Sequence, residues 1–215
     1  MFIPDRKICV VGAGGFGREV MCCLQDALKP AGLDVREAAC FMVSDDHVVS
    51  DRLMGVEVIA RSDFDAARYD VVVAIGDPSA RKAMVQDLPE QTRFVTIIHP
   101  TAVVSEWVEL GEGNIVTAGT MLTCGIRTGR HVQLNLHTTV GHDCMLGDFC
   151  TTAPAVNISG NCTLGEGVYA GTNACIRQGI RIGDWVTLGM GAVVVKDIAE
   201  AGVHVGNPAR LLQRD

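Results

Sequence analysis

The 215-residue chain has few aromatic residues, no long apolar run and little positive charge. Its apolar runs all fall short of the roughly 18 residues that indicate a membrane-spanning helix. The first residues, MFIPDRKI, lack the apolar segment and the cleavage site of a secretion signal. We therefore expect no membrane partner and a cytoplasmic location.

The balance of charges and the spacing of the cysteines narrow the partners further. Lysine and arginine number 18 against 25 acidic residues, which gives a net charge of −7 at pH 7. Because a nucleic-acid-binding surface usually carries a basic patch, no nucleic-acid partner is expected. The nine cysteines form no CxxC pair and no zinc-finger spacing, and without a secretion signal they should stay reduced. The sequence thus predicts neither disulfides nor a metal site.

The first 96 residues alternate between strand-like and helix-like stretches. An apolar stripe at Val20, Leu24 and Leu28 predicts a helix that ends near Pro30 and Gly32, and residues 78–88 predict a second helix with proline in its first turn. Predicted strands occupy residues 7–13, 38–44, 69–76 and 93–98. This alternation indicates an α/β domain with a Rossmann-like parallel sheet over residues 1–96.

A glycine-rich turn follows the first predicted strand. Gly12, Gly14 and Gly17 have the GxGxxG spacing of a dinucleotide-binding turn. Glycine lets the backbone approach a pyrophosphate closely, and the N-terminus of the next helix offers free N–H groups to it. NAD and a nucleotide-diphosphate sugar both carry a pyrophosphate, so the turn alone does not choose between them.

From Ile98 onward a six-residue period replaces this alternation. Every sixth position from Ile98 to Val194 is apolar or small, and 14 of these 17 positions hold Ile, Leu or Val. The position four residues further on is also small or apolar, including Cys144, Cys150 and Cys162, for which we expect an inward structural role. A hexapeptide period predicts a parallel β-helix whose triangular coil takes 18 residues, and we place it at residues 97–215.

These features together resemble the left-handed β-helix acyltransferases of the hexapeptide-repeat superfamily. Within it, the chain is similar to the bacterial sugar acyltransferase family of the sialic-acid and bacillosamine pathway type. The resemblance rests on the segments VVGAGGFGREV at 10–20, AIGD at 74–77, IIHPTAVVS at 97–105, NLHTTVGHDCMLGDF at 135–149 and VGNPAR at 205–210. Family members include N-acetyltransferases that act on nucleotide-linked 4-amino-4,6-dideoxysugars.

The resemblance implies that the first domain holds the nucleotide of a sugar substrate rather than NAD. The glycine loop would then bind that nucleotide sugar through Gly12, Gly14, Gly15, Phe16 and Gly17. Phe16 stands where some family members have histidine, which leaves sugar or base specificity open. After the second predicted strand, Asp45 and Asp46 would contact the base or ribose, although they could equally be solvated loop acids.

The resemblance also places the chemistry at His142 and Asp143. A histidine with its ordinary pKa of about 6.5 is largely neutral at pH 7 and can accept a proton from an amine. His142 matches the family's catalytic histidine, and Asp143 matches the acid that orients it. Asn135 matches a substrate-positioning asparagine, with a structural corner asparagine as the rival role, and His137 is a further candidate for substrate contact.

The coenzyme side follows from the 18-residue coil and from the tail. Gly160 lies one coil after His142 and would donate its N–H to the thioester oxygen, unless the glycine serves only a turn with positive φ. Gly206, Asn207, Pro208, Ala209 and Arg210 would lie beside the coenzyme A arm, with Lys196 or Arg210 near its phosphates. A family histidine that approaches the cofactor is replaced here by Thr151. The short tail favours acetyl-CoA over an acyl carrier protein.

Three rival readings stay open at this point. His137 and His142 have a spacing found in zinc β-helix enzymes, but no third histidine is in register, and Cys124 is the only other candidate ligand one coil away. A sugar O-acetyltransferase would use the same base, and a non-catalytic scaffold would not need these motifs together. We therefore expect a homotrimeric, acetyl-CoA-dependent N-acetyltransferase of a UDP-, dTDP- or GDP-linked 4-amino sugar such as GDP-perosamine.

Overall fold

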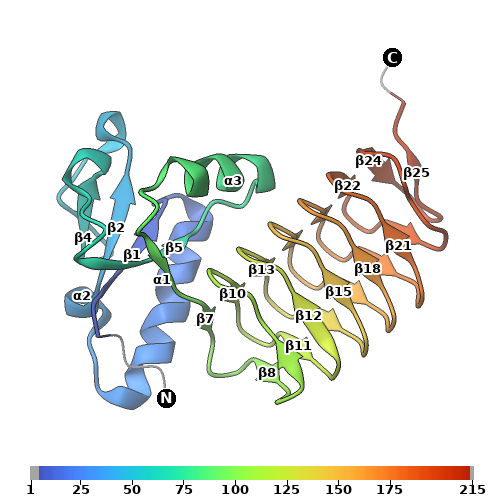
Figure 1. The fold of residues 1–215 in the computed structure, drawn as a ribbon, viewed down its shortest axis with the longest axis horizontal. Helices are drawn as coiled ribbons and strands as arrows, with labels where there is room; N and C mark the ends of the chain where they lie inside the picture. The colour runs from blue at the N-terminus through green and yellow to red at the C-terminus, as the bar shows by residue number, and fades with distance from the viewer. Residues whose placement is uncertain (1–4, 214–215) are drawn as a thin grey trace.

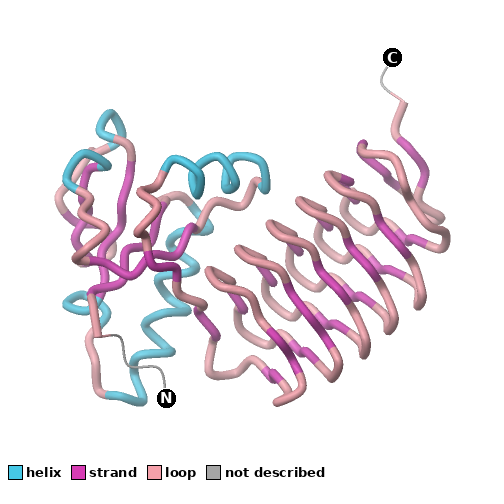
Figure 2. Tube along the Cα trace, in the orientation of Figure 1, coloured by secondary structure: helices cyan, strands magenta, loops and turns pink. Residues whose placement is uncertain are grey.

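A computed structural model describes residues 5–213 and confirms the predicted α/β part followed by a left-handed parallel β-helix (Figure 1). Within these residues all helices lie in the first part, and the second consists of very short strands joined by turns (Figure 2). No helix among the described residues is both long and apolar enough to cross a membrane.

The first part is built on a six-stranded sheet in the order β3-β4-β2-β1-β5-β6. All neighbouring strands are parallel except β3 and β4, which form an antiparallel pair. The strands are β1 (Lys7–Val11), β2 (Ala39–Val43), β3 (Arg52–Leu53), β4 (Val56–Ala60), β5 (Tyr69–Val73) and β6 (Arg93–Phe94). The central strands β1, β2 and β5 are apolar apart from Lys7 and Asp70, because both faces of the sheet are covered.

The helices begin and end close to where the sequence places them. Helix α1 (Gly15–Leu28) buries Val20, Leu24 and Leu28, and a short 3-10 turn over Lys29–Ala31 ends at Gly32. Helix α3 (Pro78–Asp87) is capped by Asp77, whose carboxylate accepts a hydrogen bond from the Ala80 N–H at 2.7 Å. The remaining helical segments are α2 (Val35–Ala38) and 3-10 turns at Asp45–His47 and Arg61–Asp63.

The prediction of one strand over 93–98 is wrong, because the chain changes partners in the middle of this segment. The Val95 N–H still donates to the Val71 carbonyl in the α/β sheet, whereas the Ile97 N–H donates to the Asn114 backbone carbonyl in the β-helix. The segment is therefore divided into β6 and β7 (Ile97–Ile98), and β7 is already the first strand of the β-helix.

The β-helix has three sheets, which are parallel except for the antiparallel last pair of the first sheet. Stacked residues are 18 apart, as in the pair Gln133 and Thr151, except in the last coil, where Val186 and Gly202 are 16 apart. The first sheet contains β7, β10 (Ile115–Val116), β13 (Gln133–Leu134), β16 (Thr151–Thr152), β19 (Tyr169–Ala170), β22 (Val186–Leu188), β24 (Gly202–Val205) and β25 (Arg210–Leu211). The second contains β8 (Val103–Val104), β11 (Met121–Leu122), β14 (Thr139–Val140), β17 (Asn157–Ile158), β20 (Cys175–Ile176) and β23 (Val193–Val194). The third contains β9 (Val108–Glu109), β12 (Ile126–Thr128), β15 (Met145–Leu146), β18 (Thr163–Leu164) and β21 (Arg181–Ile182).

The interior of the β-helix is the apolar stack that the period predicts. Leu134, Val140 and Leu146 of one coil are almost fully buried, and Cys144 and Cys162 also lie in this core. At the corners, non-glycine residues take the left-handed conformation, as Asp143 and Asn161 do at φ 59° and 58°. The corners thus depend on tolerated positive φ at polar residues as well as on glycine.

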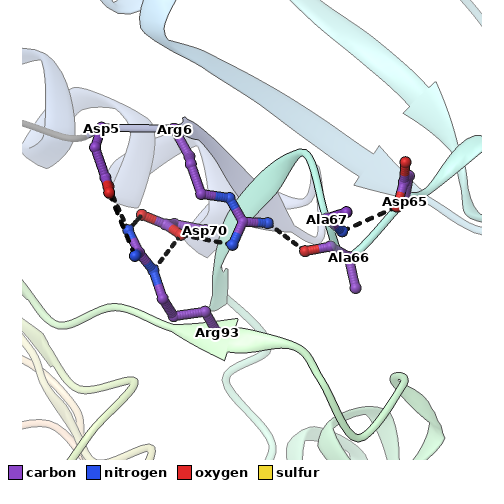
Figure 3. A network of polar contacts seen from close by, with 7 residues as sticks. All are labelled: Asp5, Arg6, Asp65, Ala66, Ala67, Asp70 and Arg93. Carbon is purple, nitrogen blue, oxygen red and sulfur yellow. Dashed lines mark hydrogen bonds and ion pairs between the residues drawn. The ribbon is translucent and has the colours of Figure 1, made fainter.

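A charged network holds the N-terminal end of β5 (Figure 3). The nearly buried carboxylate of Asp70 accepts two hydrogen bonds from Arg93, at 2.7 and 2.6 Å. Arg93 also pairs with Asp5, whose pKa this hydrogen bond lowers, and Arg6 donates to the Ala66 carbonyl. The network fastens the start of the described chain to β5 and β6.

Candidate active site

His142 and Asp143 form a hydrogen-bonded pair at the corner between β14 and β15. His142 Nδ1 lies 2.8 Å from Asp143 Oδ2, and both side chains are exposed. When the imidazole is neutral and Nδ1 donates to the carboxylate, Nε2 carries a free lone pair. The pair therefore presents an oriented base at the surface of the β-helix.

Gly160 stacks directly over this imidazole. A Cβ added to Gly160 would stand 2.5 Å from His142 Nε2, so any side chain would collide with the ring. Gly160 does not have positive φ; the left-handed residue of this corner is Asn161. The alternative that Gly160 serves a turn with positive φ is therefore wrong, and closeness to His142 explains the glycine. Gly160 is buried, and among residues 5–213 its N–H donates to no protein acceptor.

Asn135 and His137 lie at the preceding corner, between β13 and β14. The Asn135 side chain accepts a hydrogen bond from the Leu136 N–H at 3.2 Å, and its carbonyl accepts one from the Thr138 hydroxyl at 2.7 Å. His137 is exposed and has φ 58°. The structure records no hydrogen bond from either side chain to His142, so their contact with substrate stays a prediction.

The C-terminal loop closes over the last coil of the β-helix. The Gly206 carbonyl accepts from the Val193 N–H at 3.0 Å, and the Ala209 N–H donates to the Val193 carbonyl at 2.8 Å. Asn207, Pro208 and Arg210 are exposed. The loop is thus anchored at both ends while its middle stays free, and a role toward coenzyme A remains a prediction.

A cavity of about 620 Å³ lies at the carboxyl edge of the α/β sheet. Gly12 and Gly14 of the glycine loop line it, together with Ser44 and His47 after β2. Apolar side chains from several strands make up most of the remaining wall. This is the place where a nucleotide binds in open parallel sheets.

Two arginines in the cavity were missed by the sequence analysis. Arg52 and Arg61 both line it, and Arg61 donates to the Asp87 backbone carbonyl at 2.8 Å. Arg61 follows β4 directly, so its place at the carboxyl end of a parallel strand was a usable signal once β4 is recognised.

The predicted acids lie beside the cavity rather than in its wall. Asp45 accepts a hydrogen bond from the Ser62 N–H at 3.0 Å, and Asp46 pairs with His47 at 2.9 Å. The Asp46 pKa is lowered, first by its hydrogen bond with His47. These contacts give both carboxylates a local partner, and their predicted contact with the base or ribose is untested.

The other loop residues divide between packing and exposure. Gly17 is buried, and a Cβ there would lie 2.0 Å from the Gly12 carbonyl oxygen, so helix α1 can approach β1 only with glycine. Gly15 is exposed and has open space around its α-carbon. Phe16 is half-buried against the core of the sheet.

The cysteines and histidines gather no cation site. All nine cysteines are free thiols, and Cys124 is exposed one coil before His142. In the part of the chain that the structure describes, no three His, Cys, Asp or Glu side chains are grouped to hold a metal ion.

Comparisons with known proteins relate this site to a family of sugar acetyltransferases. The profile of the PglD N-terminal domain matches residues 7–88. GDP-perosamine N-acetyltransferase of Escherichia coli O157:H7 is 33% identical over 216 residues, which cover 95% of this chain and 96% of the relative.

Solved structures extend the likeness to the whole fold. The acetyltransferase domain of PglB from Neisseria gonorrhoeae FA1090, in complex with acetyl coenzyme A, matches with a TM-score of 0.87 and 32% identity, covering 97% of this chain and 100% of that one. PerB from Caulobacter crescentus, in complex with CoA and GDP-perosamine, matches with a TM-score of 0.84 and 28% identity, covering 99% and 100%.

Proposed function

We propose that this protein acetylates the 4-amino group of GDP-perosamine or a close analogue. The chain belongs to the β-helical sugar acetyltransferase family that contains GDP-perosamine N-acetyltransferase, and it is thus an acetyl-CoA-dependent acetyltransferase. The observation that carries this proposal is the His142–Asp143 pair beneath Gly160, in a chain that matches the relative over almost its whole length.

In the proposed reaction His142 is the general base. The sugar amine attacks the thioester carbonyl of acetyl-CoA, and His142 Nε2 accepts the proton that the amine loses. Asp143 holds the imidazole through Nδ1 and stabilises its cationic form. The imidazole then returns the proton to the departing CoA thiolate, so the catalyst ends in its starting state.

Gly160 is the proposed oxyanion donor. As the tetrahedral intermediate forms, negative charge develops on the former carbonyl oxygen of the acetyl group. A backbone N–H held in place can stabilise that charge without reorganisation, and the Gly160 N–H has no protein acceptor among the described residues. Gly206–Arg210 would bind the coenzyme arm, with Lys196 or Arg210 near its phosphates.

The proposed nucleotide site is the 620 Å³ cavity at the glycine loop. Gly12, Gly14, Gly15 and the N-terminus of α1 would hold the diphosphate, and Phe16 would lie at the sugar side. Arg52 and Arg61 both line the cavity and suit a diphosphate substrate, and Asp87, which also lines it, lies 3.4 Å from Arg61 and offsets part of that charge. We also propose a homotrimer that works in the cytoplasm.

The test is thiol release from acetyl-CoA with GDP-, UDP- and dTDP-linked 4-amino-4,6-dideoxysugars. We expect release with the GDP series and a loss of more than 100-fold in kcat for His142→Ala. Glu112→Gln, at a different corner, serves as the control and should keep full activity. If none of the amino sugars supports thiol release, the proposed reaction is overturned. If His142→Ala releases thiol as fast as the wild type, His142 is not the base.

A further inference from the structure

Arg81 is the largest fully buried side chain of the molecule and lies between its two parts. It projects from α3, and the whole residue is only 1% exposed. It makes hydrogen bonds in three directions. Nε donates to the His131 carbonyl at 3.0 Å, Nη1 to the Ile75 carbonyl at 2.7 Å, and Nη2 to the Phe149 carbonyl at 2.7 Å.

Two β-helix side chains complete this arrangement. Nη1 also donates to Gln133 Oε1 at 2.9 Å, and Nη2 donates to Thr151 Oγ1 at 2.8 Å. Both partners reach back to the α/β sheet: Gln133 Nε2 donates to the Val73 carbonyl at 2.9 Å, and the Thr151 hydroxyl lies 3.2 Å from the Gly76 carbonyl. The guanidinium, the end of β5 and two β-helix strands therefore form one closed network.

Among residues 5–213 no carboxylate accepts a hydrogen bond from the Arg81 side chain. Its burial lowers the pKa of the guanidinium to about 10. A buried charge is costly, and here carbonyl, amide and hydroxyl oxygens offset that cost together with the nearby carboxylate of Asp77, which favours the charged form without a hydrogen bond to the guanidinium. Arg93 differs, because its partner Asp70 at the opposite end of β5 is a carboxylate. The guanidinium donates to buried carbonyls of both parts, which an apolar side chain would leave without a donor, so Arg81 fixes how the two parts meet.

The network lies at the level of His142 along the axis of the β-helix. Gln133 is nine residues before His142 and Thr151 is nine residues after it, which is half a coil in each direction. His142 therefore lies halfway along the coil that runs from Gln133 to Thr151, the two side chains that accept hydrogen bonds from Arg81. Arg81 thus binds the β-helix at the coil that contains His142, the proposed base.

On its other side Arg81 grips the wall of the nucleotide cavity. Its two carbonyl acceptors there are Ile75 and Gly76, and Ile75 lines the cavity. The glycine loop rests on the same segment, since a Cβ at Gly12 would lie 3.1 Å from the Ala74 carbonyl oxygen. The position of residues 74–76 along the β-helix axis thus fixes the position of the glycine loop along the same axis.

We propose that Arg81 is a positioning residue, which sets the nucleotide cavity at a fixed height against the coil of His142 so that the tethered sugar amine arrives at the acetyl group. The inference rests on the proposed function. It requires the planar fork of arginine, because the three donors of a lysine ammonium all sit on one nitrogen and cannot reach His131, Gln133 and Thr151 together. Arg81 touches neither substrate and is not a catalytic residue.

The experiment compares Arg81→Lys, Arg81→Gln and Thr151→Val with Asp70→Asn, which weakens the opposite end of β5. For each folded variant we would measure kcat, both KM values, the affinity for GDP alone, and melting temperature. We expect kcat with the nucleotide sugar to fall 10- to 100-fold for both Arg81 variants and less for Thr151→Val. KM for acetyl-CoA and the affinity for GDP should stay within about twofold, because each separate site is intact.

Asp70→Asn should lower the melting temperature without changing kcat. If the Arg81 variants behave in the same way, Arg81 is merely structural and the proposal is overturned. If the wild type acetylates no sugar, the proposed function fails. In that case the inference, which rests on the proposed function, fails with it.

Discussion

At the scale of single residues, the contact between Gly160 and His142 has a direct consequence for substitution. Alanine is sterically allowed by the backbone at position 160, but its Cβ would stand 2.5 Å from His142 Nε2. We expect Gly160→Ala to displace the imidazole and to lower kcat at least 100-fold while the β-helix stays folded. Steady-state kinetics and circular dichroism measure both effects.

A double variant separates displacement of the ring from general damage. In a His142→Ala background the colliding imidazole is absent, so Gly160→Ala should then cost little stability. Melting temperatures of the four proteins would show this coupling as non-additivity. Equal destabilisation in both backgrounds would mean that Gly160 is needed by the backbone rather than by the histidine.

We expect His131 to make the stability of the protein sensitive to acid. It is buried between Phe94 and Phe149, and burial lowers its pKa from 6.5 to about 4. Between these two values the unfolded chain binds a proton that the folded chain does not, so stability falls as pH falls from 6.5 to 4. The loss should be roughly 3 kcal/mol at most, measured by urea unfolding at pH 7 and pH 4.5.

His131→Phe is the matched variant for this effect. Phenylalanine already occupies the equivalent left-handed position one coil later, at Phe149, so the backbone tolerates it. The variant should lose part of the decrease in stability between pH 7 and pH 4.5. An unchanged pH dependence would assign the acid sensitivity to other groups.

Sequence reasoning placed His142, Asp143 and Gly160 together because the 18-residue coil converts chain separation into spatial neighbours. It did not find Arg61, because the strand that precedes that residue was not recognised. Nor did it find Arg81, because an arginine on a predicted helix is usually solvent-exposed. Only the packing of α3 against the β-helix reveals that this side chain is buried.

At the scale of structural elements, aspartates at one row of corners connect successive coils. Asp184 Oδ1 accepts a hydrogen bond from the Glu166 N–H at 2.8 Å, and Gly165 leaves the space for that carboxylate. Removing the acceptor leaves the N–H without its protein partner. We expect Asp184→Ala to lower the free energy of unfolding by about 1 kcal/mol, measured by urea denaturation.

The side-chain amide of asparagine keeps the acceptor without the charge. Asp184→Asn should therefore retain most of the stability. If both variants lose the same amount, charge rather than the hydrogen bond explains the effect, and salt titration would then reduce the difference from the wild type.

The elements were predictable to different degrees for physical reasons. The β-helix follows from its period, since each apolar position repeats in register over the whole prism. The antiparallel pair β3 and β4 was missed because its turn uses Met54 and Gly55, with φ 55° and 78°, instead of a recognised asparagine–glycine turn. The division at residues 95–97 depends on a choice of partner strand that local sequence does not encode.

At the scale of the whole molecule, apolar side chains remain exposed on the β-helix. Val103 and Met121 stack on neighbouring strands of one sheet and are 60% and 51% exposed, and Trp107 is 68% exposed at the adjacent corner. Association would cover such a patch. We expect a trimer by sedimentation at micromolar concentration, and a shift toward monomer for Met121→Glu.

The control for this prediction is Arg127→Gln, an exposed substitution on another sheet that does not place two acids side by side with Glu109. It should leave the sedimentation coefficient unchanged. If the wild type sediments as a monomer, the proposed trimer is wrong. If Met121→Glu remains trimeric, the exposed patch of Val103 and Met121 is not the contact surface.

The stacking of coils also restricts distances along the β-helix axis to whole multiples of the strand spacing. Insertion of one whole coil between Gly160 and Gly206 would leave every face aligned and move the C-terminal loop by one strand spacing, about 4.8 Å, farther from His142. A six-residue insertion would instead turn everything above it to the next face. The span between base and loop can therefore change only in steps of one coil, which takes 18 residues in the regular part of the β-helix and 16 between β22 and β24.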